Sequence, residues 1–282
     1  MRYTVLTDDD VRRVMPMSAA VDRVESALRE NAEGTMVAPP RFRVDVDKGA
    51  LIFTAGAVTH YDKAVGFRVY DRFQESHASH GQVVVVFDSD TGDFKGVIVG
   101  GHLGAMRTGA IGGVAIKHMA RPDASRAAIL GSGRQARTHL EAAAVVRHFA
   151  SVKVYSPNAT HREAFASEMR ETLDLNVDPV VSAKEAVADA DVVMCVTKST
   201  TPVFDPSWLK PGAHVNTVGP RAQGASELDA SIAGRVRVVA TDSLRQLRSY
   251  ATPYFLAETP WMEAMVDLGD IVVGKQTGRQ SP

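Results

Sequence analysis

The sequence has almost no cysteine, no long apolar run and no excess of charge of one sign. Cys195 is the only cysteine among 282 residues, which excludes an intrachain disulfide and any metal site built from several cysteines. The longest apolar runs, such as Val83–Phe87, fall far short of the roughly 20 residues that cross a bilayer. Lys and Arg number 32 against 33 Asp and Glu, so the net charge of −1 creates no general field for nucleic acid or an anionic membrane.

The N-terminus also lacks the pattern of a secretory signal. Met1-Arg2-Tyr3-Thr4 is not followed by an apolar stretch with a small-residue cleavage site. We therefore expect a soluble, cytoplasmic, globular protein without a nucleic-acid or membrane partner. The length allows about two domains, at roughly 100–200 residues each.

The first hundred residues predict a mixed α and β region. Thr7-Asp8-Asp9-Asp10 is a capping sequence for a first helix, and apolar residues spaced by three and four predict a second helix before Pro39-Pro40. Consecutive short strands favour an antiparallel or mixed sheet. They are predicted at Phe42–Val46, Leu51–Thr54, Val65–Val69, Val83–Phe87 and Phe94–Val99.

After about residue 105, strands and helices alternate, which is typical of a parallel, doubly wound sheet. A helix is predicted over Ala105–Met119. The strands that follow are predicted at Ala127–Leu130, Val152–Tyr155, Val177–Val181, Val192–Val196, Val215–Val218 and Val236–Ala240. The helices between them centre on Arg137–Arg147, Arg162–Glu171, Lys184–Ala188 and Glu227–Ala233. The change of pattern predicts a domain boundary near residue 105.

A glycine-rich sequence follows the first of these alternating strands. Ala127–Leu130 leads directly into Gly131-Ser132-Gly133-Arg134-Gln135-Ala136, a Gly-x-Gly-x-x-Ala pattern that opens a predicted helix. The first glycine permits a tight turn, the second permits close approach of a pyrophosphate, and the small third residue permits close helix packing. The helix N-terminus offers free N–H groups to the phosphates. This pattern predicts a dinucleotide site.

The end of the next strand bears on which dinucleotide is bound. An NAD site is expected to have an acidic residue roughly 20 residues after the glycines. The strand ends instead in Ser156-Pro157-Asn158, without a nearby carboxylate. Ser156 and Asn158, with Arg134 or Arg162 nearby, are candidates to accept a 2′-phosphate, so NADP is slightly favoured over NAD. The arginines are equally compatible with a solvated helix end.

Further stretches carry a resemblance to a known family. They are, in order, Met106-Arg107-Thr108-Gly109-Ala110, the loop from Gly131 to Ala136, Ala190-Asp191-Val192-Val193, Trp208-Leu209-Lys210-Pro211-Gly212-Ala213-His214-Val215-Asn216-Thr217-Val218-Gly219, Glu227-Leu228-Asp229 and Leu268-Gly269-Asp270. With these motifs the chain resembles the ornithine cyclodeaminase/mu-crystallin family over most of its length.

The resemblance implies an α/β subunit of two domains that forms a homodimer. One is a Rossmann-type NAD(P)-binding domain with a doubly wound parallel sheet, expected over 106–267. The other is a smaller α+β domain for substrate binding and dimerisation, expected over 1–105 and joined by 268–282. The residues expected to bind the cofactor are Thr108, Gly131, Ser132, Gly133, Arg134, Gln135, Ser156, Asn158, Arg162, Thr197, Lys198, Val218 and Gly219.

Three basic side chains of the family hold the α-carboxylate of the substrate. They match Arg41 (with Arg43 as the alternative one register away), Arg107, and Arg68 where the family has a lysine. Each arginine alone is also compatible with a salt-bridged surface position. Arginine suits bidentate carboxylate binding, but it stays protonated and cannot readily donate a proton. The group that donates the proton is therefore not identified by this match. Arg68 is still a candidate catalytic residue, because it occupies the position of the family's lysine.

Arg221 is the second departure from the family pattern. True ornithine cyclodeaminases have an aspartate there, six residues before the Glu227-Leu228 pair, where it handles the substrate amine and a proton. An arginine would repel a cationic ornithine side chain and cannot act as a base at neutral pH. Arg221 is thus a candidate substrate contact, or a side chain that simply points to solvent.

Histidine is the remaining candidate acid. His80 resembles a histidine of mu-crystallin-like members, and its ordinary pKa near 6.5 suits proton transfer, although a loop histidine is more often exposed. His77 and His80 have no evident third partner for a metal, so no metal site is expected. Cys195 lies within an apolar strand and is expected to be an inert core residue.

The resemblance implies an oxidoreductase that uses NAD(P)H to reduce the C=N bond of a small imino acid or ketimine, or that catalyses the reverse amino-acid dehydrogenation. The alternatives are a cyclodeaminase that recycles NAD, and an NADP-dependent binding protein without turnover, because fold alone does not choose among these reactions. The substrate is expected to carry at least one carboxylate. Family chains continue past Gly278-Arg279 with a strand and a helix, so that tail is either missing from the sequence or absent from this member.

Overall fold

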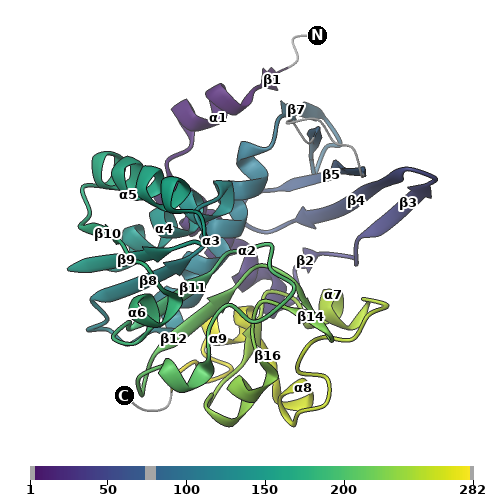
Figure 1. Cartoon of the computed structure of the whole chain (residues 1–282). Helices are drawn as coiled ribbons and strands as arrows, with labels where there is room; N and C mark the ends of the chain where they lie inside the picture. The colour runs from purple at the N-terminus through teal and green to yellow at the C-terminus, as the bar shows by residue number, and fades with distance from the viewer. Residues whose placement is uncertain (1–3, 74–80, 280–282) are drawn as a thin grey trace.

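Helix α3 (His102–Met119) lies between two β-sheets, one on either side of it in Figure 1. The structure is a computed structural model, and it describes residues 4–73 and 81–279. The first sheet precedes α3 in the chain, and the second sheet follows it. Within the described ranges, no helix has both the length and the apolar character needed to cross a membrane.

The N-terminal sheet is mixed, as the consecutive short strands predicted. All of its neighbouring strands run antiparallel except β1 and β7, which are parallel. Its order is β1 (Thr4–Leu6), β7 (Phe94–Val99), β6 (Gln82–Asp88), β5 (Ala64–Phe73), β4 (Gly49–Val58) and β2 (Met36–Val37), with β3 (Phe42–Val46) also paired to β4. Helices α1 (Asp8–Val14) and α2 (Met17–Glu33) separate β1 from β2.

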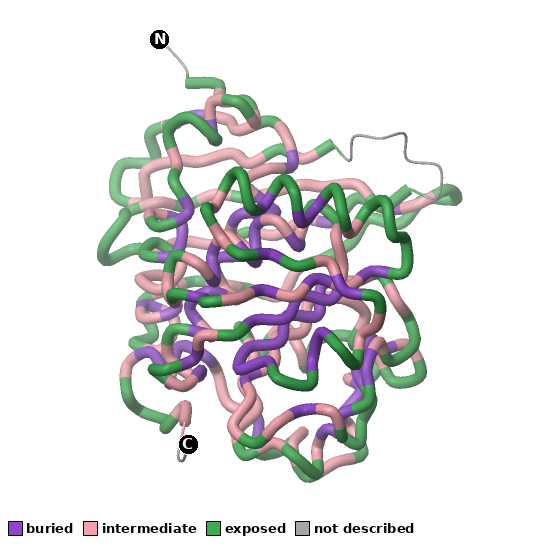
Figure 2. Tube along the Cα trace, turned by 60° about the vertical axis from the view of Figure 1, so that its left-hand side comes forward, coloured by how far each residue is buried: buried purple, intermediate pink, exposed green. Residues whose placement is uncertain are grey.

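The two faces of this sheet differ in chemistry, because successive side chains of a strand point to opposite faces. In β5, Arg68 and Tyr70 lie on one face, and Val65 and Phe67 lie on the other. Strand pairing places further apolar side chains on the same face as Phe67, and much of that face is exposed; the strands at the top of Figure 2 are pink and green, with little purple. The exposed large apolar side chains of this face are Val5, Val37, Phe42, Val44, Val46, Leu51, Val65, Phe67, Phe73, Val83 and Val99.

The second sheet is the parallel, doubly wound sheet that the alternating pattern predicted. Its order is β10 (Val177–Pro179), β9 (Ser151–Tyr155), β8 (Arg126–Leu130), β11 (Val192–Cys195) and β12 (His214–Thr217). The helices that connect these strands include α4 (Arg134–Val146), α5 (Ala159–Leu173) and α6 (Ala183–Val187). The chain order reverses beside β8, and in such sheets ligands bind at the carboxyl ends of the strands at that point.

The predicted sixth strand at Val236–Ala240 is wrong. Only Ala240–Thr241 forms a strand, β15, and it pairs with β16 (Val266–Asp267) outside the parallel sheet. The predicted helix over Glu227–Ala233 is reduced to the 3-10 turn η2 (Ala230–Gly234). A parallel crossover needs a dozen or more residues, most often with a helix, and η2 is too short for this role. The pattern of apolar residues reflects packing against the core, not a strand.

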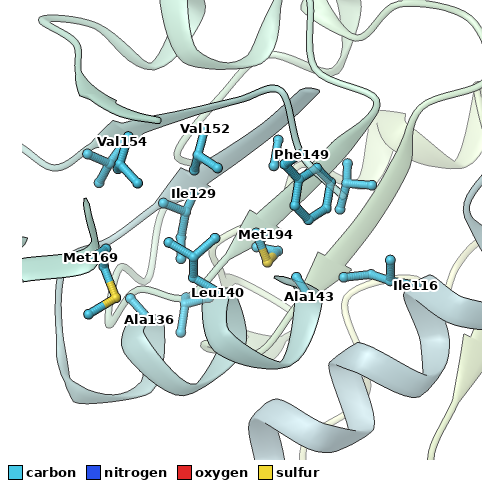
Figure 3. Packing of buried hydrophobic residues seen from close by; sticks show 14 of the residues in the cluster. Ile116, Ile129, Ala136, Leu140, Ala143, Phe149, Val152, Val154, Met169 and Met194 are labelled. Atoms are coloured by element: carbon cyan, nitrogen blue, oxygen red, sulfur yellow. The ribbon is translucent and has the colours of Figure 1, made fainter. Parts of the chain in front are cut away.

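The core of the parallel sheet is continuous with α4. Leu140 and Ala143 of α4 face Ile129 of β8 and Met194 of β11 in Figure 3, and all four side chains are buried. Complete burial of a leucine or isoleucine stabilises the fold by about 2 kcal/mol. This packing fixes α4, and hence its N-terminus, above the carboxyl ends of the strands.

Helix α3 joins the two halves of the molecule. A Cβ atom at Gly109 would lie 2.3 Å from the Thr138 carbonyl oxygen, so α3 approaches α4 more closely than any other residue would allow. On its other side α3 packs with α2 and α9 (Leu268–Val272) around a shared apolar cluster. Because α3 begins at His102, it spans the boundary predicted near residue 105, and the division into domains stays a prediction.

Between β12 and α9 the chain forms short elements. In order, they are β13 (Arg221–Ala222), β14 (Ala225–Ser226), η2, β15, α7 (Leu244–Arg248), α8 (Trp261–Ala264) and β16, while η1 (Pro206–Trp208) precedes β12. They lie together at the bottom of Figure 1, where α7 lies below β2. This segment matters because it brings residues 242–250 toward the N-terminal sheet.

Asp191 lies at the amino edge of the parallel sheet, directly before β11, and is the acceptor of several hydrogen bonds there. Its carboxylate is 4% exposed and accepts hydrogen bonds from Arg121 and Lys210, both at 2.6 Å, and from the N–H groups of Ser125 and Arg126. Burial by itself would raise the pKa of Asp191. The hydrogen bonds from Lys210, Ser125 and Arg126 outweigh burial and lower it to about 2.

Asp191→Asn should destabilise the protein by about 3 kcal/mol at pH 7, because the buried carboxylate loses its charge-assisted hydrogen bonds with the partly buried Arg121 and Lys210. The pKa of Asp191 lies below its ordinary value of 3.8, so its contribution is present above about pH 4 and is lost as the pH falls toward 2. Urea unfolding across this range measures the difference from the wild type. Asp9→Asn is the control, since Asp9 is 92% exposed in its pair with Arg12. An equal effect of the two substitutions at pH 7 would contradict the assignment.

Candidate functional site

The turn between β8 and α4 has the geometry of a phosphate-binding loop. Gly131 has a φ of +113°, and a Cβ atom there would lie 2.4 Å from the Val196 carbonyl oxygen, so only glycine fits. Gly133 is the N-cap of α4 and no side chain caps this helix. A Cβ atom on Gly133 would have no neighbour within 4 Å. The free helix N-terminus and open space at Gly133 fit a dinucleotide pyrophosphate.

Arg137 of α4 stabilises the turn between β8 and α4 by hydrogen bonds to its backbone. Its Nη1 donates to the carbonyl oxygens of Ser132 and Gly133 at 3.0 and 3.1 Å, and its guanidinium also pairs with Glu168. Arg134 and Gln135 form the first turn of α4. The Gln135 side-chain oxygen is buried and has no hydrogen-bond partner among the described residues. Such an unsatisfied atom beside a predicted cofactor loop is compatible with a ligand contact.

At the end of β9 the predicted adenosine-side residues lie together. Ser132 donates to the Ser156 hydroxyl at 3.0 Å, and Ser156 donates to the Asn158 carbonyl oxygen at 3.2 Å. Arg162 donates to the Ser156 carbonyl oxygen at 3.1 Å. The Asn158 side-chain oxygen caps α5 by accepting from the His161 N–H at 2.9 Å, so this oxygen is already occupied. No carboxylate contacts this group in the part of the chain that the structure describes.

A buried carboxylate, Glu227, holds the loops that follow β11 and β12. These loops lie at the carboxyl edge of the parallel sheet, which we call the cofactor edge. Glu227 is fully buried and accepts from the N–H and hydroxyl of Thr197, the hydroxyl of Thr217, and the N–H groups of Val218 and Gly219, at 2.6 to 3.0 Å. These bonds join the loop after β11 to the loop after β12. Glu227 therefore fixes three predicted cofactor residues, Thr197, Val218 and Gly219.

Sequence reasoning missed this role of Glu227. It placed the residue at the start of a helix, although the Glu-Leu-Asp motif marked the position. The observed η2 begins three residues later, and the Glu227 side chain turns inward. Lys198, which follows Thr197, is exposed.

Arg41 lies just before β3 and points toward α7 and β5. Its N–H and Nε donate to the Gln246 side-chain oxygen at 3.0 and 3.1 Å, and its Nη1 donates to the Tyr70 hydroxyl at 3.1 Å. The alternative residue, Arg43, is exposed and pairs with Asp45 at 2.6 Å. Only Arg41 therefore contacts the other candidate site residues.

Arg68 projects from β5 beside Tyr70. Its guanidinium carbon lies 4.5 Å from the centre of the Tyr70 ring, and its Nε is buried without a hydrogen-bond partner among the described residues. Burial and the nearby Arg107 charge lower the pKa of Arg68 to about 10, with a smaller effect of Arg41. The group still carries its charge at neutral pH.

Arg107 completes a cluster of three guanidinium groups, which we call the arginine cluster (Arg41, Arg68 and Arg107). Burial lowers the pKa of Arg107, the Asp242 charge acts in the opposite direction, and the Arg41 charge lowers the pKa further. In residues 4–73 and 81–279, no carboxylate forms an ion pair with any of the three. The cluster is thus a positive site with unused capacity for an anion.

The arginine cluster adjoins the cofactor edge. Thr108, next to Arg107 on α3, donates to the Gly104 carbonyl oxygen at 2.8 Å, and Asn216 of β12 donates to the Gly112 carbonyl oxygen of α3. Burial lowers the pKa of His139, on α4, and both Glu227 and Arg107 contribute to its electrostatic environment. Glu227 of the cofactor edge and Arg107 of the arginine cluster therefore both lie near enough to act on the buried His139 imidazole.

One of the predicted residues, Arg221, is not part of the cluster. Arg221, in β13, is exposed; together with Asp242 it affects the buried Tyr254, whose pKa is raised to about 12 mainly by burial. His80 and His77 lie outside the described residues. Within the described residues no group of three or more His, Cys, Asp or Glu side chains is arranged to hold a metal ion. Gln246 and Tyr70 are additional polar residues that sequence reasoning missed, because both are defined only by long-range contacts.

Comparisons with known proteins show what the chain is similar to. The model of the ornithine cyclodeaminase/mu-crystallin family matches residues 1–282. A Delta(1)-pyrroline-2-carboxylate reductase of Bacillus cereus is 28% identical over 288 residues, which cover 98% of this chain and 88% of that protein.

Two solved structures are similar over nearly the whole chain. One is the Delta(1)-pyrroline-2-carboxylate reductase of Thermococcus litoralis in complex with NADH and L-proline, with 29% identity, a TM-score of 0.87, and coverage of 98% of this chain and 88% of that one. The other is an archaeal alanine dehydrogenase dimer with bound NAD, with 26% identity, a TM-score of 0.87, and coverage of 100% and 88%. Both relatives have a nicotinamide cofactor bound.

Replacing each loop glycine by alanine should separate folding from nucleotide binding. Gly131→Ala combines a strained φ with a backbone collision and should destabilise the protein by about 2 kcal/mol or more. Gly133→Ala should leave thermal stability unchanged, since a Cβ atom has open space there, but weaken NAD(P)H binding by about tenfold or more. Thermal melts and nucleotide fluorescence titrations measure the two effects. Unchanged nucleotide affinity of Gly133→Ala would be evidence against pyrophosphate binding at this loop.

Proposed function

The chain belongs to the ornithine cyclodeaminase/mu-crystallin family, and we propose that it is an NAD(P)H-dependent oxidoreductase that reduces the C=N bond of a small imino acid or ketimine. The reverse reaction is dehydrogenation of the corresponding amino acid. The proposal rests chiefly on one observation: next to the dinucleotide-binding loop lies a positive cluster in which no described carboxylate forms an ion pair with any of the three arginines. The pyrroline-2-carboxylate reductases, to which the chain is similar along nearly its whole length, support the choice of reaction.

In this reaction the arginine cluster binds the α-carboxylate of the substrate. Arg68 and Arg107 offer planar forks that match a carboxylate, and a fixed carboxylate orients the neighbouring C=N carbon. The bound nicotinamide supplies the hydride. Gly131, Gly133 and the α4 N-terminus would hold its pyrophosphate, and the loops fixed by Glu227 lie at the same carboxyl edge of the parallel sheet.

The imine nitrogen must gain a proton as its carbon gains the hydride. Arg68 occupies the position where the family has a lysine, and its guanidinium remains protonated at neutral pH, even with a pKa of about 10. We assign Arg68 to binding and orientation of the substrate. His80 is retained as the candidate acid on sequence grounds.

The cyclodeaminase alternative is disfavoured by Arg221. This exposed side chain occupies the position of the aspartate that handles the amine in cyclodeaminases. A guanidinium there repels a second ammonium group and accepts no proton.

We also propose NADPH as the preferred form of the cofactor. Ser132, Ser156 and Arg162 form one hydrogen-bonded group at the end of β9. A carboxylate there would repel a 2′-phosphate, and none contacts this group among the described residues. The remaining donors of Arg162 are suited to a phosphate.

Finally, we propose that two copies associate through the exposed apolar face of the N-terminal sheet. Among the described residues this face carries eleven exposed large apolar side chains, including Phe42, Val44 and Phe67. A contiguous apolar surface of this kind is typical of a protein interface. The similar archaeal alanine dehydrogenase is a dimer, which supports a second copy as the occupant.

The proposed activity predicts loss of NADPH or NADH absorbance with a panel of cyclic imino acids, and of keto acids mixed with ammonia or methylamine. NADPH should give the lower KM. Arg107→Ala should lower kcat/KM by about 1,000-fold, equivalent to about 4 kcal/mol, because a buried charged contact to the carboxylate is lost. Nucleotide affinity should not change. Absence of turnover across the panel, with nucleotide still bound, would instead favour a binding protein.

The proposed interface predicts that the protein is a dimer in solution and that Phe67→Asp weakens the dimer by about 100-fold, because a charge is placed in an apolar contact. Light scattering after gel filtration measures the assembly. Val181→Asp is the control, since Val181 is 76% exposed and lies beyond the parallel sheet, after β10. A wild-type monomer, or equal behaviour of the two variants, would disprove this interface.

A further inference from the structure

Tyr70 contacts two members of the arginine cluster with two different parts of its side chain. Its hydroxyl accepts a hydrogen bond from Arg41 Nη1 at 3.1 Å, and its ring lies under the Arg68 guanidinium at 4.5 Å. The geometry follows from the strand, because Arg68 and Tyr70 are two residues apart on β5 and share one face of the sheet. Arg41 reaches the same point from the segment before β3.

All of the hydrogen-bond partners of Arg41 recorded among the described residues are neutral. They are the Gln246 side-chain oxygen and the Tyr70 hydroxyl. Arg68 likewise has a neutral aromatic face as its partner. A carboxylate at either place would hold a guanidinium more strongly, but it would also compete with an anionic ligand for the same donors. Neutral partners orient the cations and leave their charge available.

The cluster needs such support, because like charges repel one another. The Arg107 charge lowers the pKa of Arg68, and the Arg41 charge lowers the pKa of both Arg68 and Arg107. A free arginine side chain also has several rotatable bonds, and ordering it on ligand binding costs free energy. A side chain that already holds two guanidiniums reduces that cost before the ligand arrives.

We propose that Tyr70 is a positioning residue, which holds Arg41 by its hydroxyl and Arg68 by its ring so that both guanidiniums are preset for one carboxylate. This role rests on the proposed function, in which the cluster binds the α-carboxylate of an imino acid. Tyr70 acts through the two arginines, so its effect belongs to substrate binding and not to hydride transfer.

Tyr70→Phe and Tyr70→Leu separate the two contacts. Phenylalanine keeps the ring face and loses the acceptor, so the affinity for pyrrole-2-carboxylate, a planar carboxylate probe, should fall about tenfold in calorimetry with nucleotide present. Leucine loses both contacts and should lower the affinity several-fold further. KM of the reducible imine should rise in parallel, while kcat stays within about twofold. Tyr61→Phe is the control, since Tyr61 is 50% exposed at the turn between β4 and β5.

A double-mutant cycle tests whether Tyr70 acts through Arg41. In an Arg41→Lys background the hydrogen-bond geometry at Tyr70 is already altered, so Tyr70→Phe should add less than about a twofold further loss of affinity. A full tenfold loss in this background, or a loss confined to kcat, would show that Tyr70 does not work by positioning Arg41.

A second measurement needs no substrate. Phenylglyoxal modifies accessible arginine side chains, and mass spectrometry reports the rate at Arg41. Tyr70→Phe should increase this rate several-fold relative to wild type and Tyr61→Phe, because one of the contacts that hold Arg41 is lost. An increased rate without probe binding would uphold the positioning role and count against the proposed function. An unchanged rate, with probe affinity also unchanged, would overturn the role of Tyr70.

Discussion

The five hydrogen bonds accepted by Glu227 are the constraint on which the candidate site depends. A fully buried carboxylate is tolerated only when donors replace the water that it loses, and here the donors come from the ends of β11 and β12. The two loops are therefore fixed relative to each other, at the edge where a doubly wound sheet binds its ligands. Burial and the nearby Glu227 charge also raise the pKa of Cys195 well above its ordinary value, so this thiol stays protonated and inert.

The charged groups of the parallel sheet and of the arginine cluster differ in their partners. At the amino edge Asp191 is fully compensated by Arg121, Lys210 and two N–H groups, which is what a structural role requires. At the carboxyl edge the arginine cluster has neutral partners, Tyr70 and Gln246, and no ion pair with a carboxylate in the described ranges. A compensated charge stabilises the fold, whereas a cluster of like charges destabilises it and must be held together by other contacts, which is consistent with the proposed binding of an anion there.

Local patterns predicted most of the fold. The period-two strands of the N-terminal sheet, the alternation after α3 and the glycine loop before α4 all depend on residues close in the chain, and all three appear in the structure. The errors occurred where tertiary contacts decide. Val236 and Val239 pack on the core outside the parallel sheet, and Glu227 turns inward instead of starting a helix. A hydrophobic pattern predicts neither outcome, because it indicates which residues are buried and not which elements they pack against.

The α/β class, the phosphate loop and the candidates Arg68 and Arg107 follow from the sequence alone, because turn geometry, strand alternation and family motifs are properties of short segments. Only the tertiary structure decided that Arg41 and not Arg43 joins the cluster, and that Tyr70 and Gln246 hold it. The physical reason is distance along the chain. Arg41 and Gln246 are 205 residues apart, and their contact exists only because α7 folds back toward the N-terminal sheet.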